Sequence, residues 1–172
     1  MAREVLYRVL YGKSNLSSEP AAQARAKLLT IQDAILHDYC RRKVRSADYP
    51  GMVQQKGKTV RGTFVTGLTD RDIDRLDTFE GSQYQRHHVC PKLLENGSET
   101  KDVVAETYIF TDEGWLEPEE WDYDDFRKNK MRYWMDDSEE YDGELYTISL
   151  IASTRFTGKE NFANIDYWLI EC

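Results

Sequence analysis

Residues 76–86 read LDTFEGSQYQR and are the most informative part of the sequence. Apolar residues at helical spacing run up to Phe79, Gly81 is the residue type that ends a helix, and Tyr84 begins a stretch typical of a β-strand. The stretch therefore predicts a helix-to-strand corner with Glu80 at its bend. A carboxylate that is partly withdrawn from water beside an aromatic ring has a raised pKa and can transfer a proton at neutral pH. Glutamate also commonly precedes a C-terminal glycine, so a purely structural Glu80 stays open at this point.

The composition is that of one packed domain. At 172 residues, 40% of them hydrophobic, the chain is long enough for a real core and too short for two comfortable domains. A net charge of −8 argues against nucleic-acid binding, because neutralising phosphates needs a basic face. No apolar stretch has the length needed to span a bilayer, and the first residues do not resemble a signal peptide. We therefore expect a protein that binds neither nucleic acid nor membrane.

The cysteines indicate a reducing compartment. Cys40, Cys90 and Cys172 lie far apart in the sequence, and an odd number without a C-x-x-C pair predicts reduced thiols and a cytoplasmic location.

His88 and Cys90 share one side of a predicted strand, whereas His87 faces the other side. These are too few ligands on one face for a metal, so the sequence predicts no metal site.

Hydrophobic periodicity predicts the elements before the corner. They are a helix over residues 4–11, a helix-permissive stretch over 21–30, a strand over 31–44 that ends in the Tyr49-Pro50-Gly51 turn, and a second strand over 60–66. Thr69 is a good N-cap for the helix that leads to the corner. Ile73, Leu76 and Phe79 lie on one face of that helix, which predicts that it packs on the core.

Beyond the corner the pattern is mostly strand. Strands over 84–94 and 103–110 are predicted as an antiparallel hairpin that turns at Asn96-Gly97. An outer helix is predicted over 119–134, and residues 145–151 are strand-like. Fourteen acidic side chains between residues 112 and 144 predict a solvated face or an acidic interaction surface. We expect one domain over 1–144 and a C-terminal tail of unknown role over 145–172.

Several motifs occur in the order of a known family. The corner fits L-D-x-F-E-G-x-x-Y-x-R, Asp48–Met52 contains Y-P-G, Val60–Thr69 fits a V-x-G strand followed by G-L, and Ala105–Tyr108 fits A-x-x-Y. On these motifs the chain resembles the γ-glutamylcyclotransferase superfamily, in the branch of the γ-glutamylamine cyclotransferases and the plant avirulence-induced-gene proteins. The resemblance covers about residues 1–134.

The resemblance implies a fold and a reaction. It implies an α+β fold, a small mixed β-barrel with helices packed outside, and a small-molecule γ-glutamyl substrate in the mouth of the barrel. The substrate's α-amino group attacks its own γ-carbonyl, which gives 5-oxoproline and releases an amine or peptide. The resemblance assigns proton transfer to Glu80 and suggests substrate contacts for Tyr84, Arg86, Tyr108 and the backbone at Gly51. Tyr84 and Arg86 can equally orient Glu80, and Tyr108 can be a buried structural residue.

One motif of the family is not found at its expected place. Family members have a strand that ends in Y-G-x-L before the first helix, and in this chain Met1 stands where that motif would just have ended. We therefore expect a barrel that lacks its first strand, with two exposed strand edges and weakened activity. The alternative is an inactive member that keeps the fold and acts as a binding domain through its acidic 112–144 face. A third hypothesis is the same chemistry on a protected biosynthetic intermediate.

Overall fold

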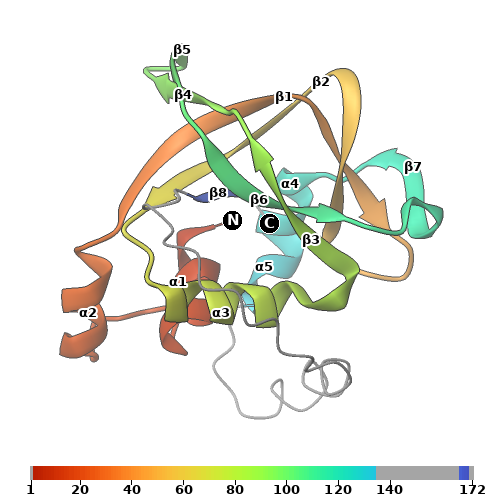
Figure 1. Ribbon diagram of the computed structural model, residues 1–172. Coiled ribbons are helices and arrows are strands. Elements are labelled where there is room, and N and C mark those ends of the chain that lie inside the picture. Colours follow the sequence, from red (N-terminus) through yellow and green to blue (C-terminus); the bar gives the residue numbers. More distant parts are fainter. Residues whose placement is uncertain (1, 135–166, 171–172) are drawn as a thin grey trace, which may run out of the picture.

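The α+β prediction is confirmed. A computed structural model describes residues 2–134 and 167–170, and Figure 1 shows a curled mixed sheet with α1, α2 and α3 below it. The elements in chain order are α1 Arg3–Tyr11, α2 Pro20–Ala26, β1 Thr30–Val44, β2 Pro50–Thr66, α3 Asp70–Glu80, a 3-10 turn Gly81–Gln83, β3 Tyr84–Val89, β4 Lys92–Glu95, β5 Ser98–Asp102, β6 Ala105–Phe110, a 3-10 turn Glu113–Trp115, β7 Leu116–Glu120, α4 Tyr123–Asp125, a π-helical turn Phe126–Lys130, α5 Met131–Trp134 and β8 Tyr167–Ile170.

The strands form one eight-stranded sheet with the order β3-β6-β8-β2-β1-β4-β5, and β7 pairs with β1. All neighbours are antiparallel except β6 and β8, which are parallel. Strand β8 thus lies inside the sheet between β2 and β6. The predicted strand over 145–151 lies outside the described residues, and so does the acidic segment beyond residue 134.

A two-residue break curls the sheet. Strand β3 pairs with β6 at one end of the order, whereas β4 pairs with β1 near the other end. Only Cys90 and Pro91 separate β3 from β4, because proline has no N–H to continue a ladder. Two strands from opposite sides of the sheet, β3 and β4, are therefore only two residues apart in the chain. Among the described strands no hydrogen-bonded ladder joins β3 to β4 or β5, so the expected barrel is curled round but is not closed by strand pairing.

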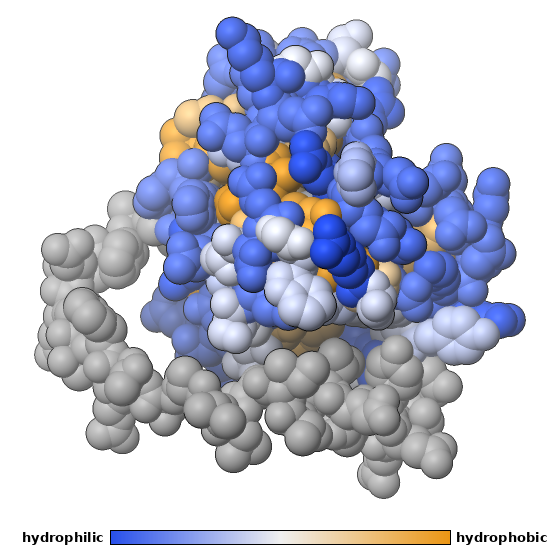
Figure 2. Space-filling view, turned by 90° about the vertical axis from the view of Figure 1, so that its right-hand side faces the viewer, coloured by the Kyte–Doolittle hydropathy of each residue, from blue (hydrophilic) through white to orange (hydrophobic). Residues whose placement is uncertain are grey.

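The inside of the curl is apolar. Buried residues from β1, β2, β3, β4 and β6 pack together there: Ala34, Leu36, Met52, Val60, Phe64, Val89, Leu93 and Ala105. Figure 2 shows hydrophobic residues between hydrophilic side chains on the side of the molecule that it presents. A second apolar cluster joins α1 and α3 to the sheet through Leu6, Leu10, Val65, Leu76 and Tyr108.

Two predictions near Gly51 are wrong, namely the start of strand β2 and the Tyr49-Pro50-Gly51 turn. Strand β2 begins at Pro50 rather than at residue 60, because residues 50–54 already pair with β1. Pairing resumes at Thr59 after an irregularity that contains the polar residues 55–58. The Tyr49-Pro50-Gly51 segment is therefore the start of a strand and not the turn. Gly51 pairs with Arg42 and is buried. A β-carbon there would lie 2.6 Å from Leu116 Cδ2 and 2.8 Å from Phe110 Cγ, so close packing requires the glycine.

The predicted outer helix also begins later than expected. Residues 116–120 form β7 at the edge of β1, where Leu116 lies opposite Val44. The helical stretch starts at Tyr123 because Asp122 caps it by accepting the Asp125 N–H at 3.0 Å. That acidic N-cap was the available sequence signal for the boundary.

Helix α3 is held at its start, as the sequence predicts. Thr69 and Asp72 form a capping box, in which the Thr69 N–H donates to Asp72 Oδ2 at 3.1 Å and the Asp72 N–H donates to Thr69 Oγ1 at 3.3 Å. Arg25 from α2 donates to Asp72 Oδ1 at 2.7 Å. Burial raises the pKa of Asp72, but the Thr69 hydrogen bonds and the Arg25 charge outweigh burial and leave the pKa below its ordinary value. The start of α3 is thus fixed by its own capping box and by an ion pair with α2.

The central place of β8 can be tested with proline. Leu169 pairs with Thr63 of β2, and proline disrupts an inner strand by removing an N–H donor, so Leu169→Pro should lower the free energy of unfolding by about 1–3 kcal/mol. Lys101→Pro, in the edge strand β5, is the control and should cost less. Urea unfolding followed by circular dichroism measures both. Equal small losses would contradict the inner position of β8.

Candidate active site

The corner between α3 and β3 forms as the sequence predicts. Glu80 is the last residue of α3, and Gly81 follows with φ 69° and ψ −169°, a conformation that is essentially restricted to glycine. The Gly81 N–H donates to the Asp77 carbonyl. The chain then makes one 3-10 turn and enters β3 at Tyr84. The backbone therefore fixes where the Glu80 side chain starts.

The Glu80 carboxyl group is withdrawn from water although the residue as a whole is only half-buried. Burial raises its pKa from 4.5 to about 7, the amino-terminal charge acts against this, and the negative charge of Asp77 adds to it. The ring of the preceding Phe79 stands edge-on to Trp134 at 6.1 Å. A carboxyl group with this pKa holds a proton about half of the time at neutral pH, which suits it to both accept and donate.

Asp77 is the centre of a polar network beside Glu80. It lies three residues before Glu80 and thus on the same side of α3. The Tyr108 hydroxyl donates to Asp77 Oδ1 at 2.7 Å, and Arg86 Nε lies 3.2 Å from the same oxygen. Arg86 Nη1 donates to Glu106 Oε2 at 2.9 Å. The network joins one helix to two strands.

Tyr108 lies close enough to Glu80 for the Glu80 charge to raise the pKa of Tyr108. Tyr108 is 4% exposed. Its pKa is raised first by burial, then by its hydrogen bond to Asp77, and further by the charges of Asp77 and Glu80. The Tyr108 hydroxyl therefore remains a hydrogen-bond donor over the whole physiological pH range.

The two other predicted substrate contacts have packing partners. Tyr84 lies opposite Phe110 with the rings edge-on at 5.2 Å, and its hydroxyl donates to the Pro50 carbonyl at 2.9 Å. The space in front of Gly51 is filled by Leu116 and Phe110. The structure thus brings Glu80, Tyr108 and Arg86 into one cluster and places Tyr84 and Gly51 at the junction of β2, β3 and β6.

Sequence reasoning missed Asp77 and Glu106 as members of the site. Asp77 could have been found, because its spacing from Glu80 puts both carboxylates on one side of a helix. Glu106 could not be found from the sequence, because counting residue pairs outward from the Asn96-Gly97 turn gives the wrong cross-strand partners for β3. A bulge between Lys92 and Leu94 shifts the register by one residue, so that Arg86 pairs with Tyr108 instead of Thr107.

Other kinds of site find no support in the part of the chain that the structure describes. No three His, Cys, Asp or Glu side chains gather there in a way that could hold a metal ion. His88 contacts Glu106 at 3.7 Å, and Cys90 is exposed. Within the same residues no helix has the length and apolar character required to cross a bilayer.

These features define a class of protein: an α+β domain with a curled mixed sheet and, at a helix-to-strand corner, a buried carboxyl group with a raised pKa. The family model described as "Gamma-glutamyl cyclotransferase, AIG2-like" matches residues 9–136. The chain therefore belongs to this family, and the resemblance found in the sequence is confirmed.

Relatives of the chain are found in Arabidopsis thaliana. Protein AIG2 C is 31% identical over 97 residues, which are 55% of this chain and 56% of that protein. Protein AIG2 B is 32% identical over 101 residues, 57% of each chain. The chain thus spans little more than half the length of these relatives. The solution structure of another Arabidopsis thaliana protein aligns with a TM-score of 0.49 and 24% identity over 83% of this chain and 89% of that one.

The two glycines that follow helices allow a matched test of the corner. Gly81 and Gly12 both have positive φ and open space where a β-carbon would stand, but only Gly81 adjoins Glu80. We expect Gly81→Ala to cost about 1–3 kcal/mol of stability and to change the pKa of Glu80, measured by carboxyl-carbon NMR. Gly12→Ala should cost about 1 kcal/mol and leave that pKa unchanged. The same Glu80 pKa in both variants would show that the corner backbone does not position the side chain.

Proposed function

We propose that the protein cyclises the γ-glutamyl group of a small-molecule amine or peptide to 5-oxoproline and releases the amine. The observation that carries this proposal is the Glu80 carboxyl group, held at the corner with a pKa of about 7. Membership of the γ-glutamyl cyclotransferase, AIG2-like family supports it. A location in the cytoplasm is part of the proposal, and the free cysteines Cys40 and Cys90 are consistent with it.

The proposed reaction needs little beyond orientation and proton transfer. The nucleophile and the carbonyl carbon belong to the same molecule, so holding them in the cyclic geometry supplies much of the rate. The attacking nitrogen forms the ring C–N bond, and the bond from the carbonyl carbon to the leaving nitrogen breaks. Over the reaction the attacking nitrogen loses two protons and the leaving nitrogen gains two. No electron is transferred and no outside group is taken up, so this chemistry calls for no cofactor.

Glu80 is the proposed carrier of these protons. As a carboxylate it takes a proton from the substrate's ammonium group, which frees the lone pair for attack. As a carboxylic acid it returns a proton to the leaving nitrogen when the C–N bond breaks. With a pKa near 7 neither step is strongly uphill at neutral pH. A fully hydrated glutamate, with its pKa at 4.5, would accept the first proton far less readily.

Glu80→Gln is the direct test of this role. The amide keeps the shape of the side chain but cannot exchange a proton, so 5-oxoproline formation from a panel of γ-glutamyl amines and peptides should fall at least about 100-fold. Mass spectrometry detects the product. Asp74→Asn is the matched control, because Asp74 is an exposed carboxylate on the same helix, and its rate should not change. Equal rates in the parent protein and in Glu80→Gln would exclude Glu80 as the proton carrier, and no product from any substrate would refute the proposed function.

The same substitution should stabilise the fold at high pH. Because the Glu80 pKa is about 7 in the folded protein and near 4.5 when unfolded, the folded state binds the proton more tightly. This group's contribution to the free energy of unfolding therefore falls as the pH rises from about 4.5 to about 7. Glu80→Gln does not titrate, so it should exceed the parent in stability at pH ~8 by on the order of 1–3 kcal/mol. Urea unfolding at several pH values checks this, and the difference should vanish towards pH ~4.

A further inference from the structure

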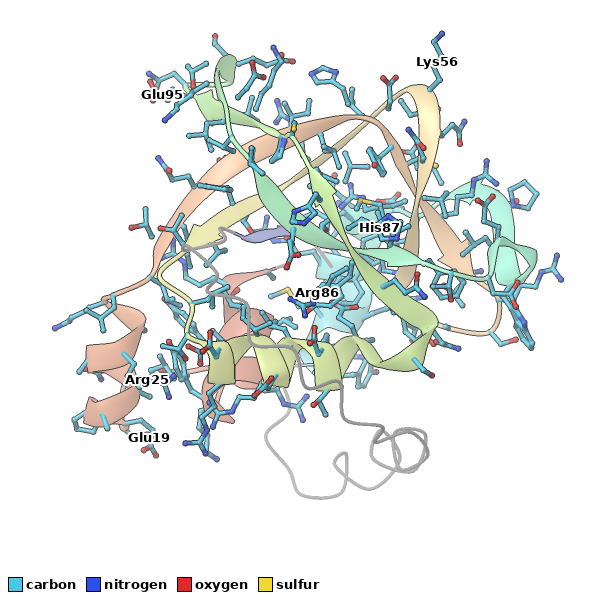
Figure 3. The ribbon with its side chains drawn as sticks, viewed as in Figure 1. Glu19, Arg25, Lys56, Arg86, His87 and Glu95 are labelled. Atoms are coloured by element: carbon cyan, nitrogen blue, oxygen red, sulfur yellow. The ribbon has the colours of Figure 1, made fainter. Side chains whose placement is uncertain are left out.

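Two side chains from the sheet hold one carboxylate beside Glu80. The Tyr108 hydroxyl of β6 and the Arg86 guanidinium of β3 both contact Asp77 Oδ1, at 2.7 and 3.2 Å. Figure 3 shows Arg86 in the space between β3 and α3. Asp77 lies on the same side of α3 as Glu80, one helical turn earlier. The Asp77 carboxylate is therefore fixed from two strands at once.

The guanidinium of Arg86 is shared between two negative charges. Besides Asp77 it contacts Glu106 Oε2 at 2.9 Å, and the side chain of Glu106 is only 12% exposed. Charge-assisted bonds of this kind are among the stronger interactions of side chains. An anionic group of a substrate would have to compete with both carboxylates. Arg86 is therefore better suited to hold Asp77 than to bind a substrate carboxylate.

We propose that Arg86 and Tyr108 are positioning residues of the proposed reaction, which hold the Asp77 carboxylate beside Glu80 and thereby control when Glu80 exchanges its proton. This inference rests on the proposed function and changes the expected roles of Arg86 and Tyr108, which the family resemblance suggested as substrate contacts. The negative charge of Asp77 favours the protonated form of Glu80. Arg86 contacts the same Asp77 carboxylate, so we expect its positive charge to limit that effect.

The titratable and charged groups that face this site come from three elements and the chain start. They are Asp77 and Glu80 in α3, Arg86 and His88 in β3, Glu106 and Tyr108 in β6, and the amino-terminal charge, which lowers the pKa of Glu80. Asp77 is the group on which two of the others converge. Changing Asp77 or its holders should therefore move the titration of Glu80 in predictable directions.

Two substitutions should move the pKa of Glu80 in opposite directions. Asp77→Asn keeps an oxygen for the Tyr108 hydroxyl but removes the negative charge, so the pKa should fall below about 7. Arg86→Gln removes the charge that offsets Asp77, so the pKa should rise above about 7. Carboxyl-carbon NMR of the substrate-free protein measures both values without any turnover. Arg71→Gln, an exposed arginine on the same helix, is the control and should leave the pKa in place.

The pH profile of kcat/KM should follow these shifts. With a pKa of about 7 the parent protein retains about a tenth of its maximal kcat/KM at pH ~6. Asp77→Asn should retain a larger fraction at that pH and Arg86→Gln a smaller one. Tyr108→Phe removes one hydrogen bond to Asp77 and keeps the ring, so kcat should fall several-fold while KM stays within about twofold.

Two results would overturn the inference. One is an unchanged NMR pKa of Glu80 in both Asp77→Asn and Arg86→Gln, or a shift in the same direction. The other is a rise in KM alone, with an unchanged pH profile, in Arg86→Gln or Tyr108→Phe, which would indicate direct contact with the substrate. Failure of the proposed function is distinguishable, because the NMR titration does not depend on catalysis.

Discussion

The packing of α3 against the sheet is the constraint on which the site depends. Leu76 is fully buried among residues of α1 and of the sheet, including Leu10, Val65 and Tyr108. This contact fixes the position of the helix on the sheet, since buried apolar surface favours the packed arrangement and protein interiors are close-packed. A capping box holds one end of the helix and a glycine conformation ends the other. The Glu80 carboxyl group therefore stays withdrawn from water although water would bind its charged form better.

The same helix shows how surroundings decide the charge of a buried acid. Asp72 and Glu80 stand at opposite ends of α3, and burial raises the pKa of each. At the N-terminal end, backbone and hydroxyl donors of Thr69 together with the Arg25 guanidinium satisfy the carboxylate, and its pKa falls. At the C-terminal end the helix dipole and Asp77 both disfavour a negative charge. The charged form of Asp72 thus stabilises the fold, whereas the charged form of Glu80 destabilises it.

Local signals in the sequence identified much of this arrangement, and long-range signals did not. Thr69, Gly81 and the Asn96-Gly97 turn each act on their own neighbours, so the start and end of α3 and the position of that turn were predictable. The strands beside the turn were not, because the predicted pair 84–94 and 103–110 is divided into β3, β4, β5 and β6. The family motifs pointed to Glu80. The extension of β2 over polar residues depends on a partner strand rather than on its own composition. The pairing of Arg86 with Tyr108 depends on a single bulge in another part of the hairpin. The contact of Glu106 with Arg86 became visible only when that register was known, whereas the spacing of Asp77 from Glu80 within α3 was already present in the sequence.

The inner position of β8 has a consequence for biosynthesis. In the hydrogen-bond order of the sheet, residues 167–170 lie between β2 and β6, and they follow β2 by more than a hundred positions in the chain. Until that segment leaves the ribosome, the nascent domain presents two open ladders to its surroundings. The eight-stranded sheet is complete only after residues 167–170 have been synthesised, so chaperones that shield β edges should bind nascent chains that lack this segment.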